Sequence, residues 1–123
     1  MARPGSVIGW KLDRDQREQL LARFPPRYAE AVADHVTLEV NAQDKPLPPD
    51  VDAAILGRAD DGRGVEAMVV AIDGSTGRPD GSTFHITWSL GAGRRAKESN
   101  DAIRDHGWSE IEPVPVTLTP ARF

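Results

Sequence analysis

The sequence predicts an α+β fold whose strands pair mostly antiparallel, and two observations favour it. Short apolar segments typical of strands, about six in number, are interleaved with only two helix-like segments. Two of the apolar segments, residues 51–60 and 64–73, are joined by the turn sequence Asp-Gly-Arg-Gly, which is typical of a hairpin and hence of antiparallel pairing. The chain has 123 residues and no long linker, so residues 1–123 are expected to form one domain.

The N-terminal part is predicted to run strand, helix, strand. Residues 6–12 (SVIGWKL) have the pattern of a strand, and Asp13 is placed to cap the helix that follows. Gln16 stands where it can reach back and complete a capping box. The helix covers residues 14–24 and stops at a pair of prolines, and a second strand is expected at about residues 34–41. The apolar face of the helix is formed by Leu20, Leu21 and Phe24.

The C-terminal part is predicted to contain a strand, a short helix and a final strand. After a proline-rich loop and the hairpin, a polar turn leads into a strand at residues 83–90. Residues 91–107 begin as a loop and become a helix that Gly107 terminates. Residues 112–120 form the last strand. Pro113 and Pro115 favour an edge of the sheet, because proline cannot donate a ladder hydrogen bond.

Two of the predicted strands carry the same motif. The segments DHVTLEV (residues 34–40) and FHITWSL (residues 84–90) each place a histidine two positions before a threonine, and they use two of the three histidines in the chain. Side chains alternate faces along a strand, so the histidine and threonine of each motif share a face. The residues expected on the polar faces are His35, Thr37 and Glu39 in one strand, and His85, Thr87 and Ser89 in the other. The residues expected in the core are Val36, Leu38 and Val40, and Phe84, Ile86, Trp88 and Leu90.

Two such faces suit the hydrolysis of a phosphodiester. An imidazole has an ordinary pKa of about 6.5, so at neutral pH it can act as a base or as an acid. A threonine hydroxyl can donate a hydrogen bond to a phosphate oxygen. Two copies supply a base, an acid and two oxygen-binding donors, and this set needs no metal. A single copy more often belongs to a solvated face or to the core, and it is the repetition that favours a site.

Composition limits the other functions. The chain has no cysteine, which excludes disulfides and thiolate chemistry and fits a cytoplasmic location. The net charge of −4 provides no general attraction to nucleic acid, so extended sequence-specific nucleic-acid binding is not expected and a nucleotide must be held by a local site. No metal and no cofactor are expected, because the motif histidines have no third ligand at a recognised spacing. The N-terminal segment lacks a long apolar run, so neither a signal peptide nor membrane association is expected.

The repeated H-Φ-T-Φ pattern, where Φ is apolar, resembles the signature of the two-histidine (2H) phosphoesterase superfamily. The stretch FHITWSLGAGRRAKESN (residues 84–100) is similar to the second-motif region of the cyclic phosphodiesterase domains of plant and fungal tRNA ligases. The resemblance extends over roughly residues 6–120. It implies a bilobal fold in which mostly antiparallel sheets carry the two motifs along a central cleft.

The resemblance also implies an activity and its residues. His35 and His85 would form the acid–base pair, and Thr37 and Thr87 would bind the phosphate oxygens. The substrates would be 2′,3′-cyclic phosphates of nucleotides or RNA ends, opened to 2′-phosphates, and the two histidine roles stay unassigned. One departure is Asp34, which stands where relatives often carry a small or apolar residue, and strand alternation points its side chain away from that of His35.

Several residues outside the motif are further candidates for substrate binding. Arg94, Arg95 and Lys97 closely follow the second motif and would add positive charge near a phosphate, unless they belong to an ordinary solvated loop. Ser89 shares the polar face of the second motif. Tyr28 could stack on a nucleobase, although packing at a rim is the simpler expectation.

Other polar and aromatic residues in the same regions are expected to be structural. Ser99 and Asn100 suit helix capping better than binding, and His106 suits the C-terminal end of a helix. Trp88 stands where an aliphatic residue is commoner in the superfamily, and it is expected to pack in the core.

Three alternatives stay open. The same chemistry could act on cyclic oligonucleotide signals or on 2′–5′ linkages. The cleft could instead bind a phosphate or an RNA end without cleaving it. The domain could also be purely structural or bind a protein partner, in which case neither histidine would matter for ligand binding.

Overall fold

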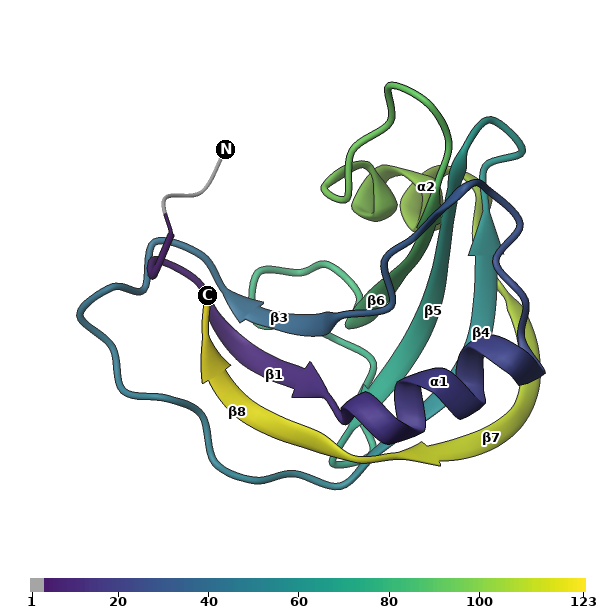
Figure 1. Cartoon of the computed structure of the whole chain (residues 1–123). Coiled ribbons are helices and arrows are strands. Elements are labelled where there is room, and N and C mark those ends of the chain that lie inside the picture. The colour runs from purple at the N-terminus through teal and green to yellow at the C-terminus, as the bar shows by residue number, and fades with distance from the viewer. Residues whose placement is uncertain (1–3) are drawn as a thin grey trace.

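The computed structural model describes residues 4–123, which form two helices and eight strands (Figure 1). The elements in chain order are β1 (Ile8–Leu12), α1 (Arg14–Arg23), β2 (Glu30–Ala31), β3 (His35–Glu39), β4 (Ala53–Asp60), β5 (Val65–Ile72), β6 (His85–Leu90), α2 (Glu98–His106), β7 (Ser109–Val116) and β8 (Leu118–Arg122). The predicted α+β class is confirmed, and every strand pairing is antiparallel.

The strands form one sheet that curls strongly. Its order is β7-β4-β5-β6-β3-β1-β8, and the short β2 pairs with β6. β7 and β8 lie at opposite ends of this order, yet only Thr117 separates them in the chain. The sheet must therefore curve until its two ends approach each other, and Figure 1 shows this half-barrel shape. The final segment was predicted as one edge strand. Its edge position is confirmed, since β7 and β8 end the strand order, but it forms two strands because the chain changes partner from β4 to β1 at Thr117.

The two motif strands are neighbours in the middle of the sheet but pair over a very short length. β3 and β6 are in register only at Val36 and Ile86, whereas β4 and β5 pair along most of their length. The sheet therefore has two parts that meet at this narrow contact. One part contains β3, β1 and β8, and the other contains β6, β5, β4 and β7.

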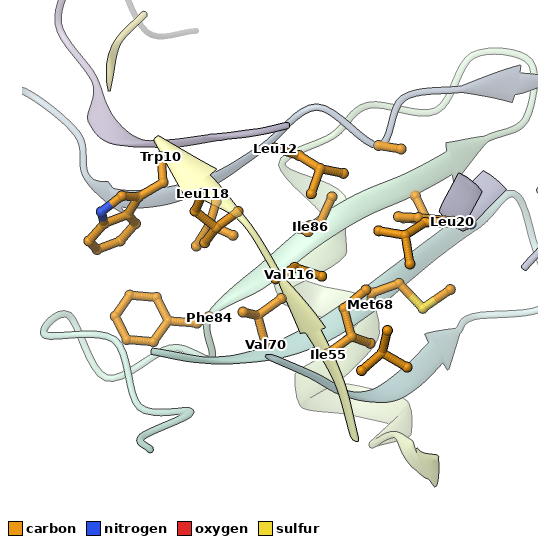
Figure 2. Close-up of a cluster of buried hydrophobic side chains, with 14 of the residues drawn as sticks. Trp10, Leu12, Leu20, Ile55, Met68, Val70, Phe84, Ile86, Val116 and Leu118 are labelled. Carbon is orange, nitrogen blue, oxygen red and sulfur yellow. The ribbon is translucent and has the colours of Figure 1, made fainter. Parts of the chain in front are cut away.

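The main core fills the inside of the curl (Figure 2). It takes one face of β5 and β6, including Met68, Ile86 and Trp88, together with Trp10 of β1 and Leu20 of α1. Leu21 and Phe24 pack against it as well, which confirms the predicted face of α1. Trp88 is fully buried and its indole Nε1 donates a hydrogen bond to the Phe24 carbonyl over 2.9 Å, so its predicted place in the core is confirmed.

The opposite face of the second part of the sheet carries α2. All eight residues of β5 are buried, because its alternate side chains, such as Ala67 and Val69, pack with Ile103 of α2. The motif side chains on β6 share this outer face, since they alternate with the core residues Ile86 and Trp88. Gly107, with φ of 70°, ends α2 as predicted.

The cap of α1 is only half as predicted. The Asp13 carboxylate accepts a hydrogen bond from the backbone N–H of Gln16 over 2.9 Å, which confirms the cap. The Gln16 side chain does not reach back to complete a capping box. It donates to the Pro115 carbonyl over 3.0 Å and accepts from the Thr117 N–H over 2.6 Å. It thereby fastens the start of α1 to the point where β7 becomes β8.

In the part of the chain that the structure describes, neither helix has the length and apolar character needed to cross a membrane.

Candidate active site

The pairing of β3 with β6 brings the two motifs face to face. In β3, Val36 lies between His35 and Thr37, and it pairs with Ile86, which lies between His85 and Thr87 in β6. The register does not continue toward the start of β3, because the Ala33 N–H donates to the Thr87 carbonyl over 2.9 Å.

All four motif side chains line one cavity of about 510 Å³. Its other walls come from the turn before β6, the loop before α2 and the two ends of the described chain. These walls include Arg78, Lys97, Asn100, Val40 and Phe123. No carboxylate side chain is among the described residues that line the cavity. Val40, predicted to be a core residue, lies beyond the end of β3 and is 47% exposed.

The imidazole of His85 is oriented by the backbone of its own segment. Its Nδ1 lies 2.8 Å from the Thr83 carbonyl oxygen, and a carbonyl can only accept, so Nδ1 carries the proton. In the neutral ring Nε2 is then the free acceptor. Burial lowers the pKa of His85 below its ordinary value. The hydrogen bond to Thr83 offsets this partly, and the positive charge of Arg78 lowers the pKa further.

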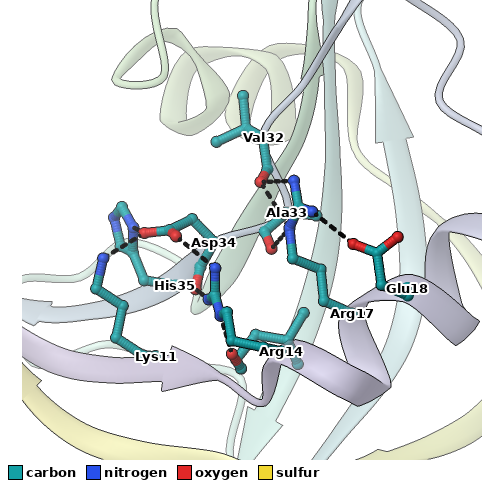
Figure 3. Close-up of polar contacts among 9 residues, drawn as sticks. Lys11, Arg14, Arg17, Glu18, Val32, Ala33, Asp34 and His35 are labelled. Carbon is teal, nitrogen blue, oxygen red and sulfur yellow. Dashed lines mark hydrogen bonds and ion pairs between the residues drawn. The ribbon is translucent and has the colours of Figure 1, made fainter.

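The imidazole of His35 is oriented by Asp34 (Figure 3). Its Nδ1 lies 2.9 Å from Asp34 Oδ2, so Nδ1 donates to a carboxylate and Nε2 is again free. Asp34 also binds Lys11 over 2.5 Å and Arg14 over 3.0 Å. Burial opposes the ionisation of Asp34, but the hydrogen bonds and charges of Lys11 and His35 outweigh burial and hold the pKa of this carboxyl well below its usual range.

The expectation that Asp34 points away from His35 is therefore wrong. Asp34 lies just before the first residue of β3, so strand alternation does not govern its side chain. Ala33 before it has a φ of 43°, which breaks the extended backbone. Arg17 of α1 holds this bend by donating to the carbonyls of Val32 and Ala33 over 3.0 Å each (Figure 3).

His35 is partly buried against the end of the described chain. The ring of Phe123 lies 4.3 Å from the imidazole, centroid to centroid. Burial is the main reason why the pKa of His35 is lowered, and the hydrogen bond and charge of Asp34 offset only part of this effect. Both motif imidazoles are thus favoured in the neutral form, with Nδ1 held by a partner and Nε2 without one among residues 4–123.

The two motif threonines differ in their surroundings. Thr37 is partly exposed, and its hydroxyl has no hydrogen-bond partner among residues 4–123. Thr87 is 8% exposed, and its hydroxyl lies 2.9 Å from that of Ser99 and 3.3 Å from the Ala96 carbonyl. Thr87 donates its proton to the Ala96 carbonyl in this long bond, and Ser99 can donate to Thr87 Oγ1. A ligand oxygen can therefore replace the Ala96 carbonyl as the acceptor of the Thr87 proton. Ser99 therefore supports Thr87, and the expectation that it caps α2 is wrong, since no side chain caps that helix.

Ser89 and Tyr28 lie outside the cavity. Ser89 is fully buried and donates to Glu66 over 2.7 Å. The Tyr28 hydroxyl donates to Asp60 over 2.6 Å. A shift of register between Glu66 and Ala67 in the pairing of β5 with β6 separates Ser89 from the motif face.

Of the three basic candidates after β6, one lines the cavity and two do not. Lys97 lines the cavity. Arg94 does not line it, because its guanidinium is engaged by Asp61, over 2.8 Å, and by Glu98. Arg95 is exposed and also does not line the cavity.

Two polar residues of the cavity wall were not predicted to be part of the site. Arg78 lies in the turn before β6, where its proline, glycine and aspartate neighbours indicate only a turn. The Asn100 side chain donates to the Lys97 carbonyl over 3.3 Å, and its Oδ1 is buried without a partner among the described residues. In the sequence, the only indication that Arg78 and Asn100 belong to the site is that both lie within about 15 residues of His85. Arg95 lies as near and does not line the cavity, so this indication does not identify them.

The arrangement can perform acid–base chemistry at a bound anion. Two imidazoles, whose Nε2 atoms have no partner in the described part of the chain, and two threonines line a cavity with basic residues in its wall. Among residues 4–123, no group of three or more His, Cys, Asp or Glu side chains is placed to hold a metal ion. Comparison of the chain with protein-family models, with curated proteins and with solved structures found no match.

Proposed function

We propose that the protein is a metal-independent phosphodiesterase of the 2H type that hydrolyses 2′,3′-cyclic phosphates of nucleotides or RNA ends. One observation carries the proposal: His35, Thr37, His85 and Thr87 line one cavity, with both Nε2 atoms free. The narrow contact between the two parts of the sheet is compatible with the bilobal 2H arrangement, in which each lobe supplies one motif.

In the proposed reaction one histidine acts as base and the other as acid. The Nε2 of one neutral imidazole takes a proton from water as the water oxygen bonds to phosphorus. The bond between phosphorus and the leaving ribose oxygen then breaks, and the protonated Nε2 of the other histidine gives its proton to that oxygen. The motif threonines donate hydrogen bonds to the two non-bridging oxygens, where negative charge accumulates. The resemblance to tRNA-ligase domains favours the 3′ oxygen as the leaving group and a 2′-phosphate as the product.

The test is the incubation of purified protein with each 2′,3′-cyclic nucleotide in the presence of EDTA, followed by separation of the 2′- and 3′-phosphates. His35→Ala and His85→Ala should each lower the rate by roughly 10²-fold or more. His106→Ala is the matched control, because this exposed histidine lies outside the cavity and its loss should leave the rate unchanged. Failure of the wild-type protein to open any cyclic phosphate would overturn the proposal.

A further inference from the structure

Arg78 has an unusual environment for an arginine in a turn. Its side chain is only 9% exposed, and it lines the cavity that holds the two histidines. One terminal nitrogen binds Asp80 over 2.5 Å, whereas Nε is buried without a partner among the described residues. A buried donor without an acceptor costs free energy, so this geometry calls for an explanation.

The backbone of the turn fixes Arg78 beside His85. Gly77 and Thr83 form a β-bridge, and the Arg78 N–H donates to the Ser82 carbonyl over 2.9 Å. Thr83 is also the residue whose carbonyl holds His85 Nδ1. The turn therefore places a guanidinium and an oriented imidazole on the wall of one cavity.

Asp80 is the partner that an anion in the cavity would have to displace from Arg78. The hydrogen bond from Arg78 is the main reason why the pKa of Asp80 lies well below its usual range. Asp80 is itself about half exposed, and Ser82 binds its other oxygen over 2.9 Å from the backbone N–H. Because Asp80 faces solvent, water partly screens its ion pair with Arg78 and can hydrate the carboxylate if Arg78 leaves it. An anion in the cavity can therefore replace Asp80 as the partner of the Arg78 guanidinium. A phosphate can accept two parallel hydrogen bonds from that guanidinium.

We infer that Arg78 is an anion-binding residue of the cavity, which pairs with Asp80 in the free protein and turns toward His85 when a phosphoryl group enters. The inference rests on the proposed function for its substrate class, but it concerns binding and can be tested apart from turnover. It assigns the recognition of negative charge to a residue of the turn, whereas Arg94 and Arg95 take no part.

The test is calorimetric titration of the protein with inorganic phosphate. Arg78→Gln should weaken binding about tenfold or more, as expected for the loss of a charge-assisted hydrogen bond. Arg95→Gln makes the same charge change outside the cavity and should have little effect. Asp80→Asn keeps the side-chain oxygen that faces Ser82 but releases Arg78, so it should tighten binding severalfold. Asp44→Asn, at an exposed site in the loop after β3, is the control for that charge change.

Each outcome decides the inference. No phosphate binding by the wild-type protein, or equal binding by Arg78→Gln and Arg95→Gln, would overturn it. Weaker binding by Asp80→Asn would show that Asp80 positions Arg78 instead of competing for it. Should Arg78→Gln fail to fold, Arg78→Lys keeps the charge without the planar fork and should bind with intermediate affinity. Phosphate binding that depends on Arg78 in a protein without hydrolytic activity would support the inference while the proposed function failed.

Discussion

The two motif imidazoles are fixed through the same nitrogen by chemically different partners. His85 Nδ1 donates to a neutral backbone carbonyl, whereas His35 Nδ1 donates to the ionised carboxylate of Asp34. The carboxylate stabilises the charged imidazolium more than a carbonyl does. The two histidines are therefore not equivalent, and the difference provides a way to tell their roles apart.

The first prediction concerns Asp34→Asn. Asp34 raises the pKa of His35, and Lys11 and Arg14 lower it, so removing the carboxylate charge should move the His35 pKa further below its ordinary value. The His85 pKa should stay in place. NMR titration of the two imidazole C–H signals measures both values, and the limb of the kcat/KM profile that moves to lower pH identifies the role of His35. A His35 pKa that is unchanged or higher in the variant would contradict this account.

The second prediction separates the two threonines. Thr37→Val removes a hydroxyl without a protein partner among the described residues, so kcat/KM should fall about 10²-fold while the melting temperature stays near that of the wild type. Thr87→Val should lower the rate similarly and also destabilise the fold by about 1–3 kcal/mol, because it leaves Ser99 without its buried partner. Rate assays and urea unfolding of both variants provide the measurements. Equal stability losses would refute the distinction.

At the scale of the elements, β1 approaches β3 so closely that only glycine fits between them. A Cβ atom on Gly9 would lie 2.1 Å from the Val36 carbonyl oxygen, far inside contact distance, and backbone cannot swing aside as a side chain can. Thr37 is the partner of Gly9 in this pair of strands, so the same contact sets the position of one motif.

The third prediction follows from this contact. Gly9→Ala should destabilise the protein by about 1–3 kcal/mol or more and displace β3, which lowers activity as well as stability. Gly77→Ala is the control, since its new Cβ would meet nothing closer than the Ser75 hydroxyl at 3.7 Å. Thermal unfolding and the hydrolysis assay of both variants decide the matter. A Gly9→Ala protein as stable as the control would mean that β1 and β3 are spaced differently.

Regular elements could be predicted from local pattern, and the departures have physical reasons. Strict alternation and turn residues indicated the motif strands and the hairpin of β4 and β5. Apolar and polar residues alternate without a break from β7 through Thr117 into β8. The sequence therefore contains no local sign that the chain changes its partner strand at Thr117. The positive φ of Ala33 could not be predicted, because the residue at this position is not a glycine. The orientation of Asp34 depends on the bend at Ala33. Arg78 belongs to the cavity only because the turn folds back beside β6.

At the scale of the whole molecule, the cavity lies where the two parts of the curled sheet meet. One histidine comes from each part, so the cavity forms only when both parts are folded and joined. Both imidazoles are partly buried there, and burial lowers the pKa of each. The protonation of the two histidines is consequently coupled to the stability of the complete fold.

The last prediction is that stability falls as the pH drops below about 6.5, the ordinary histidine value. In the unfolded chain both histidines take up a proton near that pH, whereas in the folded protein they do so only at lower pH. Between these limits the unfolded state binds more protons, so acidification favours unfolding. Above neutral pH both histidines are neutral in the folded and unfolded states, so they add no pH dependence to the free energy of unfolding. The paired carboxylates, including Asp34, contribute only at more acidic pH, because their ordinary value is near 3.8.

Urea unfolding in phosphate-free buffers at about pH 7.5, 6.5 and 5.5 measures this slope. Buffers without phosphate are needed because a ligand that binds only the folded state would add its own stabilisation. A variant that combines His35→Gln with His85→Gln should lose most of the slope, whatever its absolute stability, while His106→Gln should keep it. A wild-type protein whose stability rises toward pH 5.5 would show that the imidazoles gain more from Asp34 and Thr83 than they lose by burial, and that the neutral pair is not the resting state of the site.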